Sequence, residues 1–181
     1  MFEIVFVCTG NRNRSPLAEA ALRNALEGLP VKVRSLGLMD LGSVSVLPET
    51  LEVARRFGLD VSGHRSRCIA GADISDADLV LGFELSHAAA AVVDHGAPPD
   101  RTFTLLEFAR LGKTLPEPSE QASDPGSIVA QAYQLRKSRS VVPAGVGDPF
   151  GGTASGFTHM GETIVAACNE LAEILFGRSR I

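Results

Sequence analysis

The beginning of the chain alternates between strand-like and helix-like patterns, with a polar loop between the first two. Phe2 to Val7 (FEIVFV) is a nearly continuous apolar run, which is typical of a central strand covered on both faces. After the loop, apolar residues from Leu17 to Leu26 recur at helical spacing, and Gly28 ends that helix. Val31 to Ser35 then alternates like a second strand. A strand, a helix and a strand in this order form a right-handed crossover, which constrains the chain to a parallel sheet.

The same alternation continues to the end of the sequence. It predicts two further strands, at Asp78 to Phe83 and at Arg101 to Thr104. It also predicts helices over Pro48 to Phe57, Leu85 to Val93, Leu105 to Leu111, Ser127 to Ser138 and Thr158 to Phe176. The expected fold is therefore α/β, an open, mostly parallel twisted sheet of about four strands with helices on both faces.

Composition and charge exclude several classes of protein. Hydrophobic residues make up 45% and charged residues 21% of the 181 residues, as in an ordinary globular domain. The formal net charge of -4 gives no overall field that favours nucleic acid or an anionic membrane. No apolar run approaches the roughly 20 residues of a membrane span, and the first residues lack a basic region and a cleavage site of small residues. We therefore expect a cytoplasmic protein without nucleic-acid binding or membrane insertion.

The cysteines and histidines argue against a disulfide framework and against a metal site. The three cysteines, Cys8, Cys68 and Cys168, are an odd number with wide spacing. We expect Cys68 and Cys168 to be structural and no metal or cofactor to be bound. The histidines also lack metal-ligand spacing and are interpreted as solvated or capping residues; they are His64, His87, His95 and His159.

The segment from Cys8 to Ser15 (CTGNRNRS) carries the chemistry. It joins a buried strand to a helix, at the sheet edge where ligands of open α/β folds bind. The N–H groups of such a loop and the helix dipole favour an anion. Cys8 is placed to ionise and act as a nucleophile beside Arg14, whose planar fork holds two oxygens of a phosphate. Gly10 allows close approach of the backbone to a ligand, and Ser15, which we expect to cap the helix, is also placed to donate its hydroxyl to the sulfur.

With these residues the chain resembles the low-molecular-weight protein tyrosine phosphatase family. The spacing from Cys8 to Arg14, its context VCTGNRNRSPLAEAALR and a distal Asp148-Pro149-Phe150 all match that family's pattern. Intervening segments such as 58–67 and 103–108 match as well. The resemblance implies a flavodoxin-like fold and a single domain over residues 1–181. Residues 112–142 look like an insertion.

The resemblance also implies a two-step mechanism. The Cys8 thiolate attacks phosphorus and forms a phosphocysteine, while protonated Asp148 gives its proton to the leaving oxygen and then acts as base for the hydrolytic water. Arg14 and backbone donors stabilise the charge without a metal. The substrate is a phosphorylated protein, with phosphotyrosine foremost, or a small phosphomonoester, and inorganic phosphate is product and inhibitor. The substrate-binding residues implied are Thr9, Gly10, Asn11, Arg12, Asn13 and Ser15, among which Asn11 holds the loop in shape.

Several positions leave alternatives open. Arg12 and Asn13 stand where the family commonly has an apolar residue or Thr and then Cys. Arg12 either contacts the substrate or is plain solvated surface, and its charge should disfavour a phosphoarginine substrate. Asp124 also precedes a proline and competes with Asp148 for the role of acid. We favour Asp148 because an aromatic residue follows the proline and the terminal helix is near. His64 matches a family segment, and we expect a structural role for it.

Two other functions compete with the phosphatase. A thioredoxin-coupled arsenate reductase has this fold and loop, but it needs two further cysteines close together, which Cys68 and Cys168 are not in the sequence. A phosphate- or phosphopeptide-binding module without turnover is permitted by Arg12 and Asn13. Against it, a module that only binds has no use for a nucleophile and an acid.

Overall fold

The computed structural model describes residues 1–115, 124–138 and 145–178, and its centre is a parallel sheet. The strand order is β2-β1-β3-β4, and all three pairings are parallel. The strands are β1 (Phe2–Cys8), β2 (Val31–Gly37), β3 (Leu79–Gly82) and β4 (Thr102–Thr104). The α/β fold predicted from the sequence is confirmed, with a second strand that runs on to Gly37.

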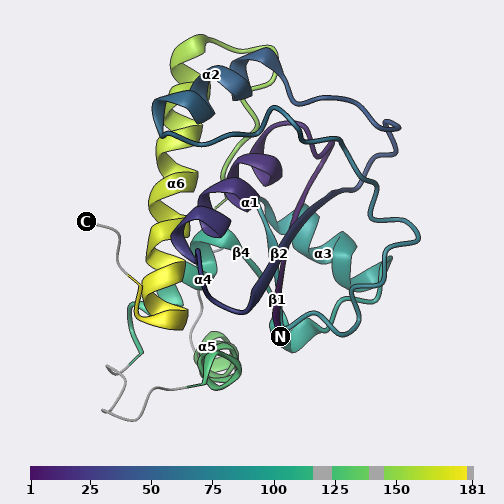
Figure 1. The fold of residues 1–181 in the computed structure, drawn as a ribbon. Helices are drawn as coiled ribbons and strands as arrows, with labels where there is room; N and C mark the ends of the chain where they lie inside the picture. Colours follow the sequence, from purple (N-terminus) through teal and green to yellow (C-terminus); the bar gives the residue numbers. More distant parts are fainter. Residues whose placement is uncertain (116–123, 139–144, 179–181) are drawn as a thin grey trace.

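Helices cover both faces of the sheet (Figure 1). On one face pack α1 (Arg14–Ala25), α4 (Leu105–Gly112) and α6 (Ala154–Phe176). On the other face α3 (Leu85–Val93) packs against β3 and β4. The remaining helical elements are α2 (Pro48–Arg56), which contacts α6, the short 3-10 helix η1 (Pro99–Arg101) and α5 (Pro125–Ser138).

Alternate side chains of β1 enter two different hydrophobic clusters. Ile4, Phe6 and Cys8 belong to the cluster beneath α1 and α6, whereas Val5 and Val7 belong to the cluster beneath α3. This alternation follows from the pleat of a strand buried on both faces. Cys8 is the last residue of β1, so the strand directs its side chain toward the first turn of α1.

The starts of the first and last helices differ from the predictions. Ser15, expected to cap the first helix, lies inside α1, which begins at Arg14 after Asn13. That prediction was wrong because the Ser15 hydroxyl contacts the Cys8 sulfur instead of a backbone N–H. The last helix, α6, begins at Ala154 rather than Thr158, because the Thr153 side chain caps it by accepting a hydrogen bond from the N–H of Gly156.

The segment predicted to be an insertion contributes α5. Residues 116–123 and 139–142 of that segment lie outside the described residues. In Figure 1, α5 lies near the N-terminal ends of the strands, and Pro125 lines the same cavity as Met1 and Phe2. The helix is therefore at the opposite end of the sheet from the loop that follows β1.

Candidate active site

The loop from Thr9 to Asn13 joins β1 to α1 and brings the Cys8 sulfur against the helix. The Cys8 Sγ lies 2.9 Å from Ser15 Oγ, and both side chains are buried. Asn11 Nδ2 donates to the same Ser15 oxygen at 2.9 Å. The Ser15 hydroxyl hydrogen then has two acceptors in reach, the sulfur and the Leu36 carbonyl at 3.5 Å. Because the sulfur is much nearer, the geometry offers a Cys8 thiolate one charge-assisted hydrogen bond.

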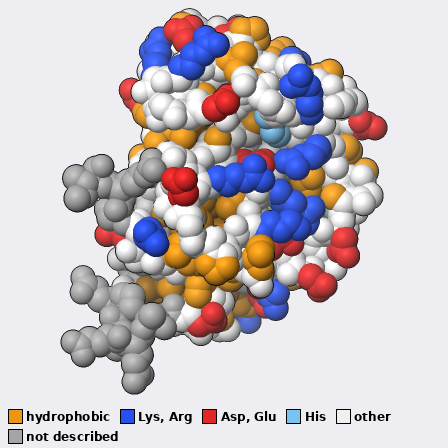
Figure 2. All heavy atoms as spheres, viewed as in Figure 1, with side chains coloured by type: hydrophobic (Ala, Val, Ile, Leu, Met, Phe, Trp, Pro, Cys, Tyr) orange, Lys and Arg blue, Asp and Glu red, His pale blue; other side chains and the backbone are white. Residues whose placement is uncertain are grey.

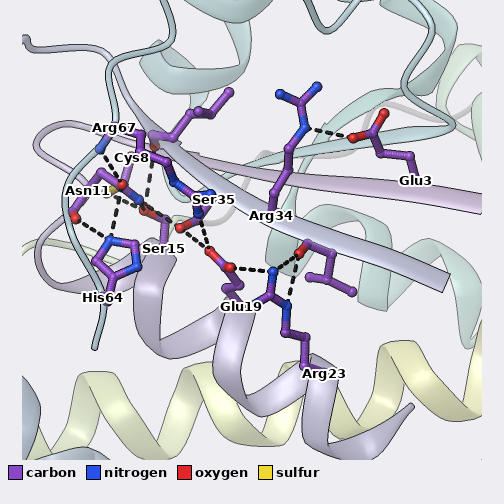
Figure 3. Close-up of polar contacts among 12 residues, drawn as sticks. Glu3, Cys8, Asn11, Ser15, Glu19, Arg23, Arg34, Ser35, His64 and Arg67 are labelled. Carbon is purple, nitrogen blue, oxygen red and sulfur yellow. Dashed lines mark hydrogen bonds and ion pairs between the residues drawn. The ribbon is translucent and has the colours of Figure 1, made fainter. Parts of the chain in front are cut away.

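Asn11 fixes the shape of the loop. Its backbone has a φ of 51°, a left-handed conformation that asparagine tolerates better than most residues. Its Oδ1 accepts a hydrogen bond from the Arg67 N–H at 2.8 Å, and its Nδ2 donates to Ser35 Oγ at 2.8 Å. The His64 Nε2 lies 3.0 Å from the Asn11 carbonyl oxygen, to which it donates. Figure 3 shows these side chains converging behind the loop.

The polar contacts continue from Asn11 to a buried carboxylate. Ser35 Oγ donates to Glu19 Oε2, which also accepts from Arg67 at 3.0 Å, while Arg23 pairs with the other Glu19 oxygen at 2.8 Å. We call this set of side chains the rear network: Asn11, Ser15, Glu19, Arg23, Ser35, His64 and Arg67 (Figure 3).

Basic side chains gather on the face formed by α1 and β2 (Figure 2). Arg23 and Arg67, on this side of the molecule, pair with Glu19. Arg34 on β2 pairs with Glu3 at 2.7 Å. Carboxylates of the chain itself thus neutralise much of the charge on this face, and two of its arginines, Arg23 and Arg67, hold Glu19 behind the loop.

Arg14 lies on the other side of the loop and is 1% exposed. Its Nη1 pairs with the Glu84 carboxylate and donates to the Val146 carbonyl at 3.0 Å. Its Nη2 donates to Asp148 Oδ2 at 2.9 Å and to Thr9 Oγ1 at 3.1 Å. The remaining donor, Arg14 Nε, is buried and has no hydrogen-bond partner in the described part of the chain. A buried donor without a partner is rare in proteins and indicates a place for an acceptor.

The loop backbone supplies further donors. Among the described residues, no acceptor is found for the N–H groups of residues 10–13. A loop that enters a helix in this way turns such groups toward an anion. We call the N–H groups of residues 10–13 and Arg14 Nε the vacant donors. The first of them follows Cys8 by two residues, so an oxyanion bound there would lie near the sulfur.

Asp148 is held beside this donor set, although it follows Cys8 by most of the length of the chain. Its Oδ1 accepts from Asn13 Nδ2 at 2.9 Å and from the Phe150 N–H at 3.2 Å. Asn13 is itself fixed, because its Oδ1 accepts from Thr50 Oγ1 at 2.8 Å. Asp124, the competing candidate for the acid, instead accepts from the Ser127 N–H at the start of α5. The structure therefore brings Asp148, and not Asp124, to the loop.

Arg12 contacts the segment before α2 through both its side chain and its backbone. Its Nε donates to the Ser45 carbonyl at 2.8 Å, and its backbone carbonyl accepts from the Leu47 N–H at 3.0 Å. This side chain belongs to the rim of the site and ties the loop to the segment before α2.

The segments around the loop expose apolar side chains. Leu41 contacts Gly10, since a Cβ on that glycine would lie 3.1 Å from Leu41 Cδ1. Leu85 follows Glu84, and Phe150 follows the Asp148-Pro149 pair. We call Leu41, Leu85 and Phe150 the apolar rim. All three are exposed, although large hydrophobic side chains are mostly buried in this protein.

Sequence reasoning missed Glu84 and the full role of His87. His87 was expected to be solvated or capping. It caps, by accepting the Glu84 N–H at Nδ1, but its Nε2 also lies 3.0 Å from Thr9 Oγ1. Both residues follow β3 at the same sheet edge as Cys8, and that position was the signal available. Burial lowers the pKa of His64 and of His87, and the Arg14 charge lowers that of His87 further.

The other two cysteines lie apart from this chemistry. Cys168 is fully buried on α6, where burial raises the pKa of its thiol, and its Sγ lies 3.7 Å from the Ala18 carbonyl. Cys68 is half-buried beside Leu38. Within residues 1–115, 124–138 and 145–178, no cluster of three or more histidines, cysteines and carboxylates that would hold a metal is found. In the same ranges, every helix is too short or too polar to cross a lipid bilayer.

Comparison with known proteins identifies relatives over most of the chain. The family model of "Low molecular weight phosphotyrosine protein phosphatase" matches residues 3–126, a range that includes the loop but ends before Asp148. The probable low molecular weight protein-tyrosine-phosphatase EpsP of Ralstonia nicotianae is 36% identical over 105 residues, 58% of this chain and 71% of that protein. The phosphatase Etp of Escherichia coli K12 is 35% identical over 122 residues, 67% of this chain and 80% of its own length.

Other similar proteins include an enzyme with a different named substrate. The protein-arginine-phosphatase of Bacillus subtilis is 34% identical over 108 residues, 59% of this chain and 71% of that protein. Among solved structures, a mutant of YwlE from Bacillus subtilis superposes with a TM-score of 0.72 at 26% identity, covering 96% of this chain and 97% of that one. The whole described fold, including the elements after residue 126, is thus that of these enzymes.

Proposed function

The chain belongs to the low molecular weight phosphotyrosine protein phosphatase family, and from this premise we propose the roles of its individual residues and its substrate. Phosphorylated proteins are the substrates that the family implies, and we propose phosphotyrosine as the residue hydrolysed. One observation carries the assignment of the site: within the described part of the chain, the buried Arg14 Nε and the N–H groups of the adjoining loop have no hydrogen-bond acceptor. A bound phosphoryl group supplies the oxygen atoms that these donors lack.

In the proposed first step, the Cys8 thiolate attacks phosphorus, the bond to the leaving oxygen breaks, and a phosphocysteine forms. Ser15 stabilises the thiolate before attack through its contact of 2.9 Å with the sulfur. The vacant donors and Arg14 stabilise the charge that the equatorial oxygens carry in the transition state. These groups are held in place before the substrate arrives, so little reorganisation opposes the reaction.

Asp148 is the proposed general acid. Its Oδ1 has two donors, Asn13 and the Phe150 N–H, so Oδ2 is the oxygen that carries the transferable proton. At present Oδ2 pairs with Arg14. A phosphoryl dianion that binds Arg14 in place would share the guanidinium charge and set like charge beside the carboxylate, which favours the protonated carboxyl that a general acid needs. Asp148 then protonates the leaving oxygen and, in the second step, accepts a proton from the water that attacks the phosphocysteine.

The apolar rim supports an aromatic leaving group. Leu41, Leu85 and Phe150 offer exposed apolar surface around the site, and a phenyl ring buries more of such surface than the short side chain of serine. Arg12 adds a cation to the loop itself, and this charge opposes the guanidinium of phosphoarginine, the substrate class named for the Bacillus relative. Inorganic phosphate is the expected product and competitive inhibitor, and a cytoplasmic location suits a catalytic thiol because thiols stay reduced there.

The test compares three variants on p-nitrophenyl phosphate and on peptides with phosphotyrosine, phosphoserine and phosphoarginine. Cys8→Ser should abolish turnover, and Asp148→Asn should lower kcat by about 10²- to 10⁴-fold. Cys68→Ser is the matched control and should hydrolyse as the wild type does. Turnover that survives Cys8→Ser, or preference for phosphoserine or phosphoarginine over phosphotyrosine, would contradict the proposal.

The competing functions predict different results. An arsenate reductase would oxidise thioredoxin in the presence of arsenate, but its relay would need Cys68 or Cys168, and Cys168 is fully buried with a raised pKa. A module that only binds would hold phosphate tightly without turnover of any of these substrates.

A further inference from the structure

Thr9 directly follows the proposed nucleophile, and the groups around its hydroxyl restrict what that hydroxyl can do. Arg14 Nη2 donates a hydrogen bond to Thr9 Oγ1 at 3.1 Å. On the other side of the same oxygen, His87 Nε2 lies at 3.0 Å. A neutral histidine has one ring nitrogen that donates and one that accepts. Which of the two faces Thr9 is decided by the partner of the other ring nitrogen.

The backbone of Glu84 decides the tautomer of His87. The Glu84 N–H donates to His87 Nδ1 at 3.0 Å, and a ring nitrogen that accepts a hydrogen bond carries no proton. The proton of the neutral ring is therefore on Nε2, so His87 donates to Thr9 Oγ1. Burial and the nearby Arg14 charge lower the pKa of His87 and so favour this neutral form. His87 is 3% exposed, which leaves its ring little room to turn.

Thr9 Oγ1 thus accepts two hydrogen bonds, one from Arg14 and one from His87. A hydroxyl has two acceptor sites and one hydrogen of its own. Both acceptor sites are occupied, and among the described residues no acceptor is found for the remaining hydrogen. Thr9 immediately precedes residues 10–13 and its oxygen contacts Arg14, so this hydrogen is available to a ligand held by the vacant donors.

We propose that the Thr9 hydroxyl donates a hydrogen bond to a phosphoryl oxygen of the substrate, and that His87 is the positioning residue that fixes this direction. The inference rests on the proposed function, since it names one more group that touches the phosphoryl oxygens. His87 touches no reacting atom. By filling the second acceptor site of Thr9 it leaves the hydroxyl hydrogen for the substrate, which is preorganisation of a donor before the substrate binds.

The first experiment separates the hydroxyl from the bulk of the Thr9 side chain. Thr9→Val keeps the shape and removes the donor, whereas Thr9→Ser keeps the donor. On a phosphotyrosine peptide, Thr9→Val should lower kcat/KM by about 10- to 100-fold, the effect expected for one hydrogen bond to a charged group. Inorganic phosphate should inhibit it more weakly by a similar factor. Thr9→Ser should stay within about threefold of the wild type. Equal activity of Thr9→Val and Thr9→Ser would overturn the contact.

The second experiment separates positioning from capping by His87. In His87→Asn, the shorter side chain still presents an amide oxygen to the Glu84 N–H, but it does not reach Thr9. We expect kcat/KM to fall by about 3- to 10-fold in the Thr9 background and not at all in the Thr9→Val background, as for two residues that act through one contact. The matched control is His95→Asn, just after the end of the same helix, which should have no effect in either background. An equal loss from His87→Asn in both backgrounds would overturn the positioning role.

The failure of this inference differs from failure of the proposed function. Turnover that depends on Cys8 but is unchanged in Thr9→Val would refute only the inference. If the wild type had no turnover, inorganic phosphate alone would still test the contact, through the rise in unfolding temperature that it causes. Thr9→Val should then need about 10- to 100-fold more phosphate than the wild type for the same rise. An unchanged requirement would refute the contact.

Discussion

The two sides of the loop after β1 contain similar polar groups in opposite states. Behind the loop, the buried Asn11 amide has a partner for each of its donors and acceptors in the rear network. In front of it, Arg14 is equally buried, yet its Nε and the N–H groups of residues 10–13 have no acceptor among the described residues. Each buried donor left without a partner costs about 1–3 kcal/mol. The satisfied side therefore stabilises a loop whose other side is destabilised in the absence of a ligand.

This contrast predicts that substitutions on the two sides of the loop should affect activity and stability differently. Changes to the front should reduce activity more than stability, because those donors contribute only when an oxyanion is bound. Changes to the rear should reduce stability and activity together, because the rear network holds the loop in the shape that presents the vacant donors.

The largest effect is expected from Arg14→Lys, at the front. Lysine keeps the positive charge but has neither the Nε donor nor the planar fork. We expect kcat/KM to fall by about 10³-fold, as when an important transition-state donor is removed. Competitive inhibition by inorganic phosphate should weaken as well. Arg34→Lys, on the neighbouring strand β2, is the control and should retain activity. A decrease of less than tenfold for Arg14→Lys would refute the role of the fork.

Asn11→Ala, at the rear, should have the next largest effect. It removes the amide that joins Ser15, Ser35 and the Arg67 N–H, and it places alanine at a positive φ. We expect a loss of about 3 kcal/mol in the free energy of unfolding, measured by urea denaturation, since several buried groups lose partners at once. Activity should fall with it. Asn24→Ala on α1 is the control and should change stability by less than about 0.5 kcal/mol. Lost activity at unchanged stability would contradict the division between the two sides.

The sequence was sufficient for the elements that local pattern controls. The alternation of apolar runs and helical spacing predicted the strand before the loop and the helix after it, and the rule for parallel sheets located the site at their junction. Glu84 and the contact of His87 with Thr9 were not recognised, because only the pairing of β1 with β3 brings their segment next to Thr9. The contact between the Ser15 hydroxyl and the Cys8 sulfur was predicted, and only the helix cap was misinterpreted, because Ser-Pro is a common helix start and a local pattern does not show which of the two partners the hydroxyl takes.

A smaller loss of stability is expected from Ser35→Ala, within the rear network. The Ser35 hydroxyl accepts from Asn11 and donates to Glu19, so its removal leaves a buried carboxylate with two arginines but one fewer hydrogen bond. We expect about 1–2 kcal/mol of destabilisation in urea, with kcat/KM reduced by less than about tenfold. Ser62→Ala, in an exposed loop, is the control. A Ser35→Ala protein with the same free energy of unfolding as the wild type would show that the rear network does not depend on this hydroxyl.

The smallest effect is expected at two histidines, one on each side of the loop. His64 is half-buried and His87 is buried. His64 donates to Asn11 near Glu19, Arg23 and Arg67, and His87 contacts Thr9 near Arg14, Glu84 and Asp148. Both have a pKa below the ordinary 6.5, so the unfolded chain binds more protons than the folded one as the pH falls through that value. Titration of these two histidines therefore leaves the free energy of unfolding unchanged above about pH 6.5 and reduces it at lower pH.

The direction of this pH dependence is tested by measuring the free energy of unfolding between about pH 7.5 and about pH 5.5. His64→Gln and His87→Asn should each reduce the slope seen in the wild type, because each removes one group that must be neutral in the folded state. His95→Asn is the control and should leave the slope unchanged, because no hydrogen bond of the His95 ring is found among residues 1–115, 124–138 and 145–178. Only the His87 variant should combine a reduced slope with the loss of activity that depends on Thr9, since His64 acts on the satisfied side of the loop. Parallel curves for all three variants would refute the neutral state of both rings and with it the donor assigned to His87.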